Sequence, residues 1–352
     1  MRERLGPALL ALALLAGCRG DPARPASAVL IVIDTLRADH LGAYGHARPT
    51  SPNIDRWSKR GALFEQALAS SPWTLPSFGA IYTGRHPSQH RAGQLIVRQP
   101  PERTFARLDA ATPTLAERLS ERGYATAAVV TNPFLHPSFG IARGIESYDY
   151  VRGDARRNRR ASAVVDRALR WLDGRDARPF LLVVHCFDPH LAYDPPPSVR
   201  GRFTAGYTGS LELPLNPLLQ IRAGRVELDA ADRRFIEAAY DEELLFVDAQ
   251  VGRLLDGLEA RGLLTDTLVM LTSDHGEEFF EHDGFEHGHS AYQELLHVPL
   301  VVWGPGVRPG RISPPVSHVD LVPTLLDALG QPVPESYFAC ERNSGFSQHA
   351  QR

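Results

Sequence analysis

The segment Leu268-Val-Met-Leu-Thr-Ser273 is a short apolar run that leads directly into Asp274-His275 and a glycine. An apolar run of this length that ends near glycine is typical of a buried strand. Further histidines follow this strand at positions 282, 287, 289 and 297. A carboxylate together with neutral imidazole suits Zn or Mn better than Ca or Mg, so the segment predicts a metal site. The alternative is a solvated acidic loop with incidental histidines.

Other segments have a similar apolar, β-rich composition and alternate with helical patterns along the chain. The predicted strands are residues 28–33, 125–130, 180–184, 268–271 and 300–302, and we expect them to be parallel. The predicted helices are residues 53–60, 76–82, 114–122, 161–172, 229–260 and 319–329. This alternation predicts an α/β fold with a mostly parallel central sheet and helices on both faces.

Polar side chains follow four of these strands at the point where each strand ends. They are Asp34, Asn132, Asp188 with His190, and Asp274 with His275. Because ligands of parallel α/β sheets gather beyond the carboxyl ends of the strands, these side chains are candidates for one site. Asn132 is a candidate oxyanion donor, although an Asn-Pro turn explains it equally well. A turn that begins Asp-Pro is likewise the alternative for Asp188.

The segment Thr74-Leu-Pro-Ser-Phe-Gly-Ala-Ile-Tyr-Thr-Gly-Arg85 has the features of a turn that opens a helix. Pro76 fits the first helical turn, where its missing N–H loses no hydrogen bond. Thr74 would then lie just ahead of outward-pointing backbone N–H groups, which can bind an anion. The alternative is that Thr74 only caps the helix.

This segment resembles the signature of the sulfatase family, Cys/Ser-x-Pro-Ser-Arg-x4-Thr-Gly-Arg, within the alkaline phosphatase superfamily. Further segments resemble motifs of that family in the same order, namely residues 33–45, 50–55, 273–277, 292–300 and 319–324. The resemblance extends over residues 29–330, which we expect to form the catalytic domain. Residues 331–352 form an irregular tail, whereas relatives continue into a small antiparallel subdomain that we expect to be missing or truncated here.

The chain departs from the family signature at the reactive position. Thr74 occupies the place of the Cys that sulfatases convert to formylglycine, and Phe78 occupies the place of the signature Arg. The resemblance implies that Asp34, Thr74, Asp274 and His275 hold a metal ion, with one imidazole gained and one carboxylate lost. This set is similar to the first metal site of nucleotide pyrophosphatases and phosphoethanolamine transferases, which use Thr as the nucleophile.

The resemblance implies a metal-dependent ester hydrolase with Thr74 as the nucleophile. His190, which matches a Pro-His motif of the family, is expected to be the acid for the leaving group or a ligand of a second ion. Asp188, His287 and His289 are candidates to complete that second site, so we expect one or two ions. The expected substrate is an anionic ester, a sulfated or phosphorylated glycan, lipid or small molecule. Thr74 slightly favours phosphoryl esters.

Two other functions stay open at this point. One is a transferase of the phosphoethanolamine type that uses the same site. The other is a metal-containing binding protein on a catalytically retired fold. The formal net charge of −3 gives no indication of nucleic-acid binding.

The N-terminus has the pattern of an export signal. A charged start precedes an apolar run too short to span a bilayer, and Leu15-Ala-Gly-Cys18 resembles the bacterial lipobox. We therefore predict a lipoprotein signal peptide over residues 1–18, lipidation of Cys18 and a tether over residues 19–28. The protein is expected to be exported and anchored through the lipid to a bacterial membrane, in the periplasm or at the cell surface. The alternatives are an ordinary cleaved signal with a chance Cys and an internal start.

Overall fold

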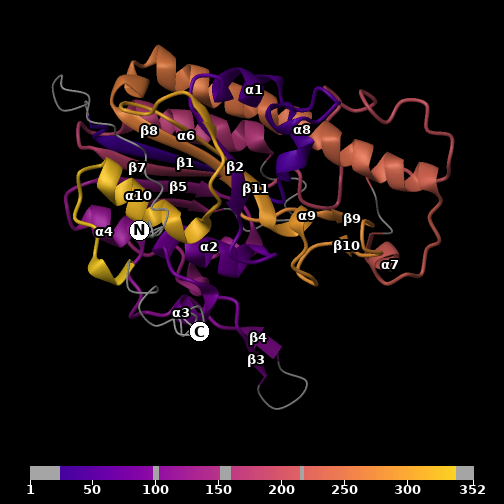
Figure 1. Cartoon of the computed structure of the whole chain (residues 1–352), viewed down its shortest axis with the longest axis horizontal. Helices are drawn as coiled ribbons and strands as arrows, with labels where there is room; N and C mark the ends of the chain where they lie inside the picture. The colour runs from indigo at the N-terminus through magenta and orange to yellow at the C-terminus, as the bar shows by residue number, and fades with distance from the viewer. Residues whose placement is uncertain (1–23, 98–102, 151–159, 215–217, 338–352) are drawn as a thin grey trace, which may run out of the picture.

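The computed structural model describes residues 24–97, 103–150, 160–214 and 218–337. Its centre is a mixed sheet in the order β12-β2-β11-β8-β1-β7-β5-β6, with β13 paired to β2 (Figure 1). The strands are β1 (Ser27–Ile33), β2 (Ala62–Leu68), β5 (Ala125–Val130), β6 (Ser147–Tyr150), β7 (Phe180–Cys186), β8 (Thr267–Ser273), β11 (His297–Trp303), β12 (Gly310–Ile312) and β13 (Val316–Ser317). β1 is parallel to β7 and β8, and β5 is parallel to β6 and β7. The predicted α/β fold with a mostly parallel sheet is confirmed.

Several strands differ from the prediction. The sequence did not predict β2, β6, β12 and β13, and it assigned the wrong orientation to β11. β11 is antiparallel to both of its neighbours, β8 and β2, so the parallel orientation expected for residues 300–302 was wrong. Only short elements separate β8 from β11, namely β9 (Glu278–Phe279), β10 (Phe285–Glu286) and α9 (Gln293–Leu296). Because no long crossover returns the chain to the opposite edge of the sheet, β11 starts at the edge where β8 ends. The intervening histidine-rich loop therefore stays at that edge.

Helices cover both faces of the sheet, as predicted (Figure 1). One face packs against α1 (Pro52–Ser58), α6 (Ala161–Gly174) and α8 (Ala230–Ala260), and the other packs against α2 (Thr74–Thr83), α4 (Leu115–Ser120) and α10 (Leu321–Ala328). Successive side chains of a strand point to opposite faces. In β1, Val29 and Ile31 face α8, whereas Leu30 and Val32 face α2. These strands are apolar on both faces, which is why they form continuous apolar runs in the sequence.

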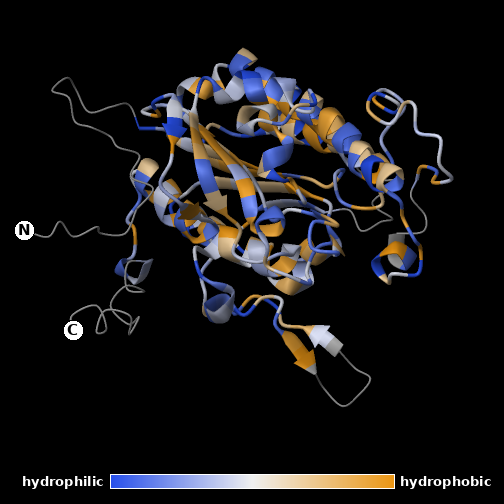
Figure 2. Ribbon diagram, turned by 45° about the vertical axis from the view of Figure 1, so that its right-hand side comes forward, coloured by the Kyte–Doolittle hydropathy of each residue, from blue (hydrophilic) through white to orange (hydrophobic). Residues whose placement is uncertain are grey.

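A two-stranded hairpin, β3 (Leu95–Val97) and β4 (Arg103–Phe105), extends away from the sheet (Figure 1). Figure 2 shows that β3 is strongly hydrophobic. The hairpin follows α3 (Pro87–His90), and two backbone hydrogen bonds hold its base: Gly93 to the Ala106 carbonyl at 2.9 Å, and Ala106 to the Gln94 carbonyl at 2.8 Å. The sequence did not predict it, because three-residue strands are too short to show a period.

Candidate active site

The alternation of the strands directs four polar side chains to the same face of the sheet. Even-numbered residues of β1 face α2, and Asp34 continues this series just beyond the strand. By the same period of two, Asp274 after β8, Asn132 after β5 and His185 in β7 also face α2. All four are at most 1% exposed. Because β8, β1, β7 and β5 are neighbours in the sheet, these groups meet at one edge.

Thr74 is the first residue of α2 and lies against these groups. The helix starts two residues before the predicted residue 76, since Trp73 is extended, and Pro76 occupies its first turn, as predicted. The hydroxyl of Ser77 donates to the carbonyl of Asp274, and this bond attaches the first turn of α2 to the end of β8. Thr74 is 1% exposed, so its hydroxyl is held inside the site instead of at the surface.

The Nε2 atom of His275 lies between the other polar groups. It is 3.4 Å from Thr74 Oγ1, 3.7 Å from Asp34 Oδ1 and 3.5 Å from Asp274 Oδ2. The Nδ1–H of the same ring donates to the Gly276 carbonyl at 2.9 Å, so Nε2 carries the lone pair. Ligand atoms that share a tetrahedral zinc ion, each at about 2.0–2.1 Å from it, are about 3.3 Å apart. The observed spacing therefore fits a shared cation better than it fits hydrogen bonds.

Two buried carboxylate oxygens without hydrogen-bond partners in the described part of the chain support a cation beside His275 Nε2. Asp34 Oδ1 and Asp274 Oδ2 are buried and have no hydrogen-bond partner among the described residues. Burial and the neighbouring Asp34 raise the pKa of Asp274 to about 7. Burial also opposes ionisation of Asp34, but hydrogen bonding to His185 and the charge of His190 outweigh it and hold the pKa of Asp34 below its ordinary value. Buried carboxylates of this kind are paired or bind metal. Asp34 and Asp274, together with His185, have ligand atoms close enough to hold one divalent ion.

Asn132 is oriented toward the Thr74 hydroxyl. Its Oδ1 accepts from the backbone N–H of Phe134 at 2.8 Å, which leaves Nδ2 facing the site. Nδ2 donates to Asp34 Oδ2 at 2.6 Å and to Thr74 Oγ1 at 3.1 Å. The Asn-Pro turn is therefore present and directs Nδ2 into the site, and the role as oxyanion donor stays a prediction.

His185 belongs to this group although it was not among the predicted site residues. Its Nε2 is 3.2 Å from Asp34 Oδ2, and its ring centroid is 5.3 Å from that of Phe78. Phe78, at the position of the signature Arg, thus presents an apolar ring where the family has a guanidinium. A histidine inside an otherwise apolar strand was the signal available in the sequence, and the prediction ended that strand at residue 184.

A second group of imidazoles lies next to His275. The ring of His287 is 4.4 Å from that of His275, and the ring of His190 is 4.9 Å from that of His287. Glu277 accepts from His287 Nδ1 at 2.8 Å and from the Tyr193 hydroxyl at 3.1 Å. Burial raises the pKa of Glu277 to about 7, whereas burial and the nearby His190 lower the pKa of His287 to about 3. Neutral His287 with Nε2 free of the proton is the form that binds metals.

Asp188 and His289 pair elsewhere. Asp188 Oδ2 accepts from the backbone N–H of Ala161 at 2.7 Å, so this side chain caps the start of α6. Burial raises the pKa of Asp188 to about 6. His289 Nε2 lies 2.8 Å from Glu278 Oε2. The residues that the structure brings together are Asp34, Thr74, Asn132, His185, Asp274 and His275, with His190, Glu277 and His287 beside them.

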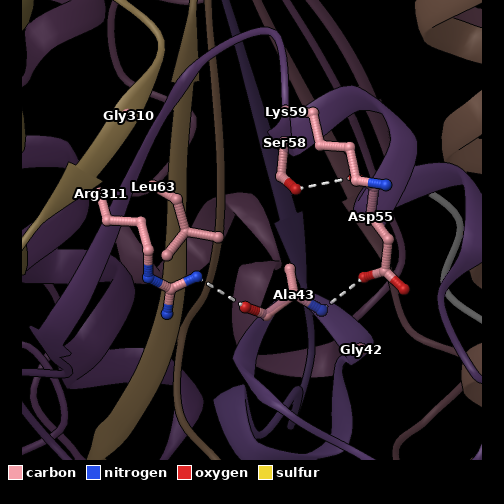
Figure 3. Close-up of a pocket in the computed structure, with 8 residues that line it drawn as sticks. All are labelled: Gly42, Ala43, Asp55, Ser58, Lys59, Leu63, Gly310 and Arg311. Atoms are coloured by element: carbon pink, nitrogen blue, oxygen red, sulfur yellow. Dashed lines mark hydrogen bonds between the residues drawn. The ribbon is translucent and has the colours of Figure 1, made fainter.

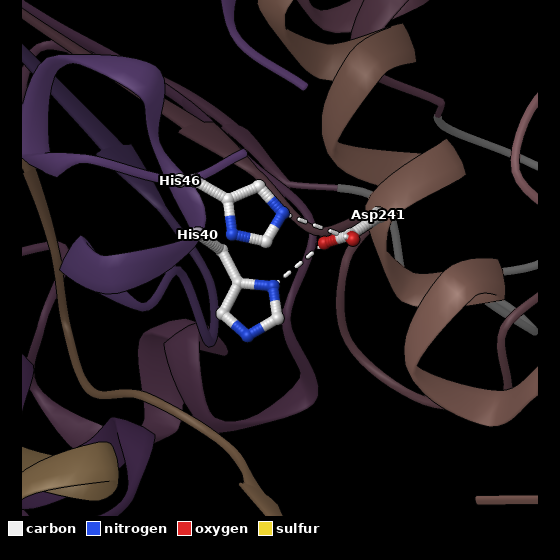
Figure 4. A group of neighbouring side chains, drawn as sticks. All are labelled: His40, His46 and Asp241. Atoms are coloured by element: carbon white, nitrogen blue, oxygen red, sulfur yellow. Dashed lines mark hydrogen bonds and ion pairs between the residues drawn. The ribbon is translucent and has the colours of Figure 1, made fainter. Parts of the chain in front are cut away.

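A different buried carboxylate lies on α8 (Figure 4). Asp241 accepts from His40 Nδ1 at 2.6 Å, from His46 Nε2 at 3.2 Å and from Arg48 Nη1 at 2.7 Å. Two imidazoles and a carboxylate could hold a metal. The guanidinium of Arg48 already neutralises the carboxylate, so we interpret this cluster as a structural link between α8 and the loop that follows Asp34.

A cavity of about 520 Å³ lies along the edge of the sheet (Figure 3). It is lined by Gly42, Ala43, Asp55, Ser58, Lys59, Leu63, Gly310 and Arg311. Arg311 donates to the Ala43 carbonyl at 3.0 Å, and the Ala43 N–H donates to Asp55 at 2.7 Å. None of the predicted site residues lines it.

This chain is similar to known proteins along most of its length. The family model described as Sulfatase matches residues 27–331. Arylsulfatase K of Xenopus laevis is 26% identical over an alignment of 332 positions, which covers 81% of this chain and 59% of that protein. A structure solved in complex with its substrate, D-glucosamine-2-N,6-O-disulfate, has a TM-score of 0.73 at 20% identity and covers 89% of this chain and 78% of that chain. The C-terminal periplasmic domain of EcEptC from Escherichia coli, in complex with Zn, has a TM-score of 0.66 at 19% identity, over 87% of this chain and 83% of that chain.

Proposed function

Because the chain belongs to the sulfatase family, we propose that it hydrolyses a sulfuric or phosphoric ester at Thr74, with phosphoryl esters favoured. The observation that carries this proposal is the convergence of His275 Nε2 and Asn132 Nδ2 on the Thr74 hydroxyl, beside two buried carboxylates. Sulfatases depend on a metal, and the carboxylates with His275 supply donors that suit Zn or Mn. A second ion beside His287 is part of the same proposal.

Thr74 is the proposed nucleophile. Asn132 donates to its oxygen at 3.1 Å, and His275 Nε2 lies 3.4 Å from it, which is the spacing of two ligands of one cation. With a cation there, the hydroxyl proton would be released to water. The remaining lone pair can then face the phosphorus or sulfur atom of an ester held at the start of α2, where backbone N–H groups of the first turn bind the non-bridging oxygens. A metal held by Asp34, Asp274 and His275 would lower the pKa of the hydroxyl and offset charge on the ester.

His190 is the proposed proton carrier. Its Nδ1–H donates to the Leu191 carbonyl at 2.9 Å, which leaves Nε2 to hold a proton for the leaving oxygen. After the leaving group departs, the same nitrogen can accept a proton from the water that cleaves the Thr74 ester. The ring stacks on Phe187 with centroids 4.4 Å apart, and this contact holds the imidazole in place.

The chemistry of the nucleophile supports phosphoryl esters. Formylglycine forms a hydrate that can expel sulfate by elimination, and Thr74 has no such route. Its ester must be cleaved by attack of water on phosphorus or sulfur. The likeness to a zinc-bound periplasmic domain supports the same metal chemistry on this fold.

We also propose that the protein is exported and anchored to a membrane through a lipid on Cys18, which lies outside the described residues. Within the part of the chain that the structure describes, no helix is both long and apolar enough to cross a bilayer. Metabolic labelling with a fatty acid tests the anchor. Label on the wild-type chain that is lost in Cys18→Ala is the expected result, and label on both chains would contradict it.

The test of the reaction compares matched substrates on one enzyme preparation. The chain without residues 1–18 is purified, its bound metal is measured, and an aryl sulfate, a phosphate monoester and a phosphate diester are assayed. We expect phosphoester turnover that falls by roughly 1,000-fold or more in Thr74→Ala. Thr83→Ala is the matched control, because this buried hydroxyl at the other end of α2 only bonds the Gly79 carbonyl.

Three results would change this proposal. Turnover of the sulfate alone, lost in Thr74→Ala, would keep the nucleophile and reverse the substrate preference. Transfer of the acid group to an alcohol with little release to water would identify a transferase on the same site. Bound metal without turnover of any ester would favour a retired catalytic site.

A further inference from the structure

The hairpin formed by β3 and β4 carries most of the exposed large hydrophobic side chains of the described residues. Among the described residues, the large hydrophobic side chains that are exposed are Leu95 (53%), Ile96 (38%), Phe105 (38%) and Tyr292 (47%). Three of these four belong to the hairpin. Such a concentration of apolar side chains on one element of a folded chain marks a binding surface more often than chance.

The pairing of the hairpin strands separates its two faces. Leu95 is directly opposite Phe105, and Ile96 is directly opposite Thr104. Paired residues of antiparallel strands share a face and successive residues alternate, so Leu95 and Phe105 lie on one face and Ile96 lies on the other. The Phe105 face turns toward the body of the protein, because the ring of Phe105 contacts that of Trp73 with centroids 4.9 Å apart.

Three aromatic rings continue from this face toward the candidate active site. Trp73 and Phe134 are in edge contact at 5.2 Å, and Phe105 and Phe134 are in edge contact at 5.8 Å. Trp73 directly precedes Thr74 in the chain, and Phe134 is the residue whose N–H fixes the amide of Asn132. The aromatic group therefore begins at the backbone of the proposed nucleophile and its hydrogen-bond donor.

Trp73 also lies near the histidine-rich loop. A Cβ atom placed on Gly288, the residue after His287, would lie 3.7 Å from the Cβ of Trp73. An ester bound at Thr74 would therefore have both the polar groups of the site and these aromatic rings as neighbours. The anionic acid group matches the polar groups, which leaves the aromatic rings to contact the remainder of the ester.

The rings form a platform and not a cage. With centroids 4.9–5.8 Å apart they contact one another, which leaves no room between them for a cation. A ligand must lie on their outer surface, where a flat apolar group makes the largest contact. We propose that Trp73, Phe105 and Phe134, extended outward by Leu95, form a subsite for a flat, apolar alcohol portion of the ester. This inference rests on the proposed ester hydrolysis at Thr74 for its substrate.

The test compares benzyl and ethyl esters of the same acid group, both of which leave as alkoxides of similar basicity. We expect the metal-loaded enzyme to prefer the benzyl ester. Phe105→Ala should reduce the benzyl-to-ethyl ratio of kcat/KM by about 5- to 20-fold, mainly through KM, with the ethyl ester nearly unaffected. Ile96→Ala is the matched control, because Ile96 has the same 38% exposure on the opposite face of the hairpin. It should leave the ratio within about twofold.

The outcomes separate the subsite from the reaction. A benzyl preference that survives in Phe105→Ala would overturn the subsite. An equal loss of kcat/KM on both esters would also overturn it and would assign the hairpin a role in folding. A dimer that dissociates in Phe105→Ala with no change in preference would assign this face to self-association.

If neither ester is turned over, the proposed function fails, and binding then tests the subsite alone. Phenylphosphonate and ethylphosphonate are titrated by calorimetry into the same protein. Tighter binding of the phenyl compound that is lost in Phe105→Ala would still support the subsite. Equal affinities, or binding of neither compound, would overturn it.

Discussion

His275 and Thr74 place their Nε2 and Oγ1 atoms 3.4 Å apart, although the two residues are 201 positions apart in the chain. A hydrogen bond to a backbone carbonyl fixes the position of each residue. The carbonyl of Gly276 fixes the tautomer of His275, and Ser77 attaches the helix that starts at Thr74 to the end of β8. The distance between these two atoms is therefore set by the junction of a strand and a helix, and the proposed chemistry depends on that junction.

Replacement of His185 by Gln should weaken zinc binding by about 10- to 100-fold. His185 Nε2 lies 3.2 Å from Asp34 Oδ2, where it either orients this carboxylate or binds the same ion. Titration calorimetry with Zn measures this effect. Asp188→Asn is the control, because Asp188 is a buried carboxylate that caps α6. Its replacement should change stability and leave metal affinity unchanged. An equal loss of affinity in both variants would show that Asp188 also serves the metal, as the sequence first suggested.

Replacement of Asn132 by Ala should lower kcat by about 100- to 1,000-fold, because it removes the donor to Thr74 Oγ1. Steady-state kinetics on a phosphate monoester, with thermal unfolding in parallel, separates this effect from misfolding. Thr131→Val is the neighbouring control. The buried Thr131 hydroxyl has no hydrogen-bond partner among the described residues, so this variant should keep kcat. A similar loss in both variants would assign Asn132 a structural role.

Replacement of Asp241 by Asn should destabilise the fold by about 2–4 kcal/mol, because it leaves Arg48, His40 and His46 without their buried carboxylate. Burial disfavours the Asp241 carboxylate, but hydrogen bonds from both histidines outweigh it and hold its pKa below the ordinary value. The hydrogen bond to Asp241 also raises the pKa of His46. Denaturant unfolding of the two proteins measures the difference.

The lowered pKa of Asp241 and the raised pKa of His46 predict the pH range in which the difference in unfolding free energy is largest. A carboxylate with a lowered pKa contributes stability above its unfolded value of about 3.9, and this contribution is lost as the pH falls through the folded pKa. A histidine with a raised pKa contributes stability below about pH 6.5, and this contribution is lost as the pH rises through the folded pKa. The deficit of Asp241→Asn should therefore be largest between about pH 4 and 6.5. An NMR titration of His46 should show a lower pKa in the variant, and an unchanged pKa would contradict the link.

Replacement of Gly276 by Ala should destabilise the active-site loop. A Cβ at this position would lie 1.9 Å from the carbonyl oxygen of Glu294, so the backbone must move, at a free-energy cost of about 2 kcal/mol or more. Gly174→Ala is the control, because a Cβ there meets nothing within 4 Å. Thermal unfolding with and without Zn should show a lower melting temperature for Gly276→Ala and an unchanged one for Gly174→Ala. Equal melting temperatures would mean that the loop adapts freely.

The sequence predicted five of the nine strands of the central sheet and the helices on its faces, because each of these elements buries its own side chains. It missed β2, β6, β12 and β13. β5 (Ala125–Val130) has the predicted bounds, and β1, β7 and β8 extend their predicted runs by a few residues at most. The positions of Asp34 and Asp274 followed from the same logic, since a polar residue after a buried strand is visible in one short window. Thr74 came from the resemblance of its segment to a family signature.

Other features depended on contacts between distant segments. The orientation of β11 follows from the lack of a crossover after β8, which periodicity does not reveal. Asp188 and His190 are only two residues apart, yet one caps a helix and the other joins the imidazoles, because the chain turns sharply between them. Apolar runs and strand-end residues record local burial, so the sequence by itself determined the sheet and the kinds of groups at its edge. The meeting of Thr74, Asn132, His185 and His275 was decided by the register of strands far apart in the chain, because only a packed sheet brings their side chains within a few ångströms of one another.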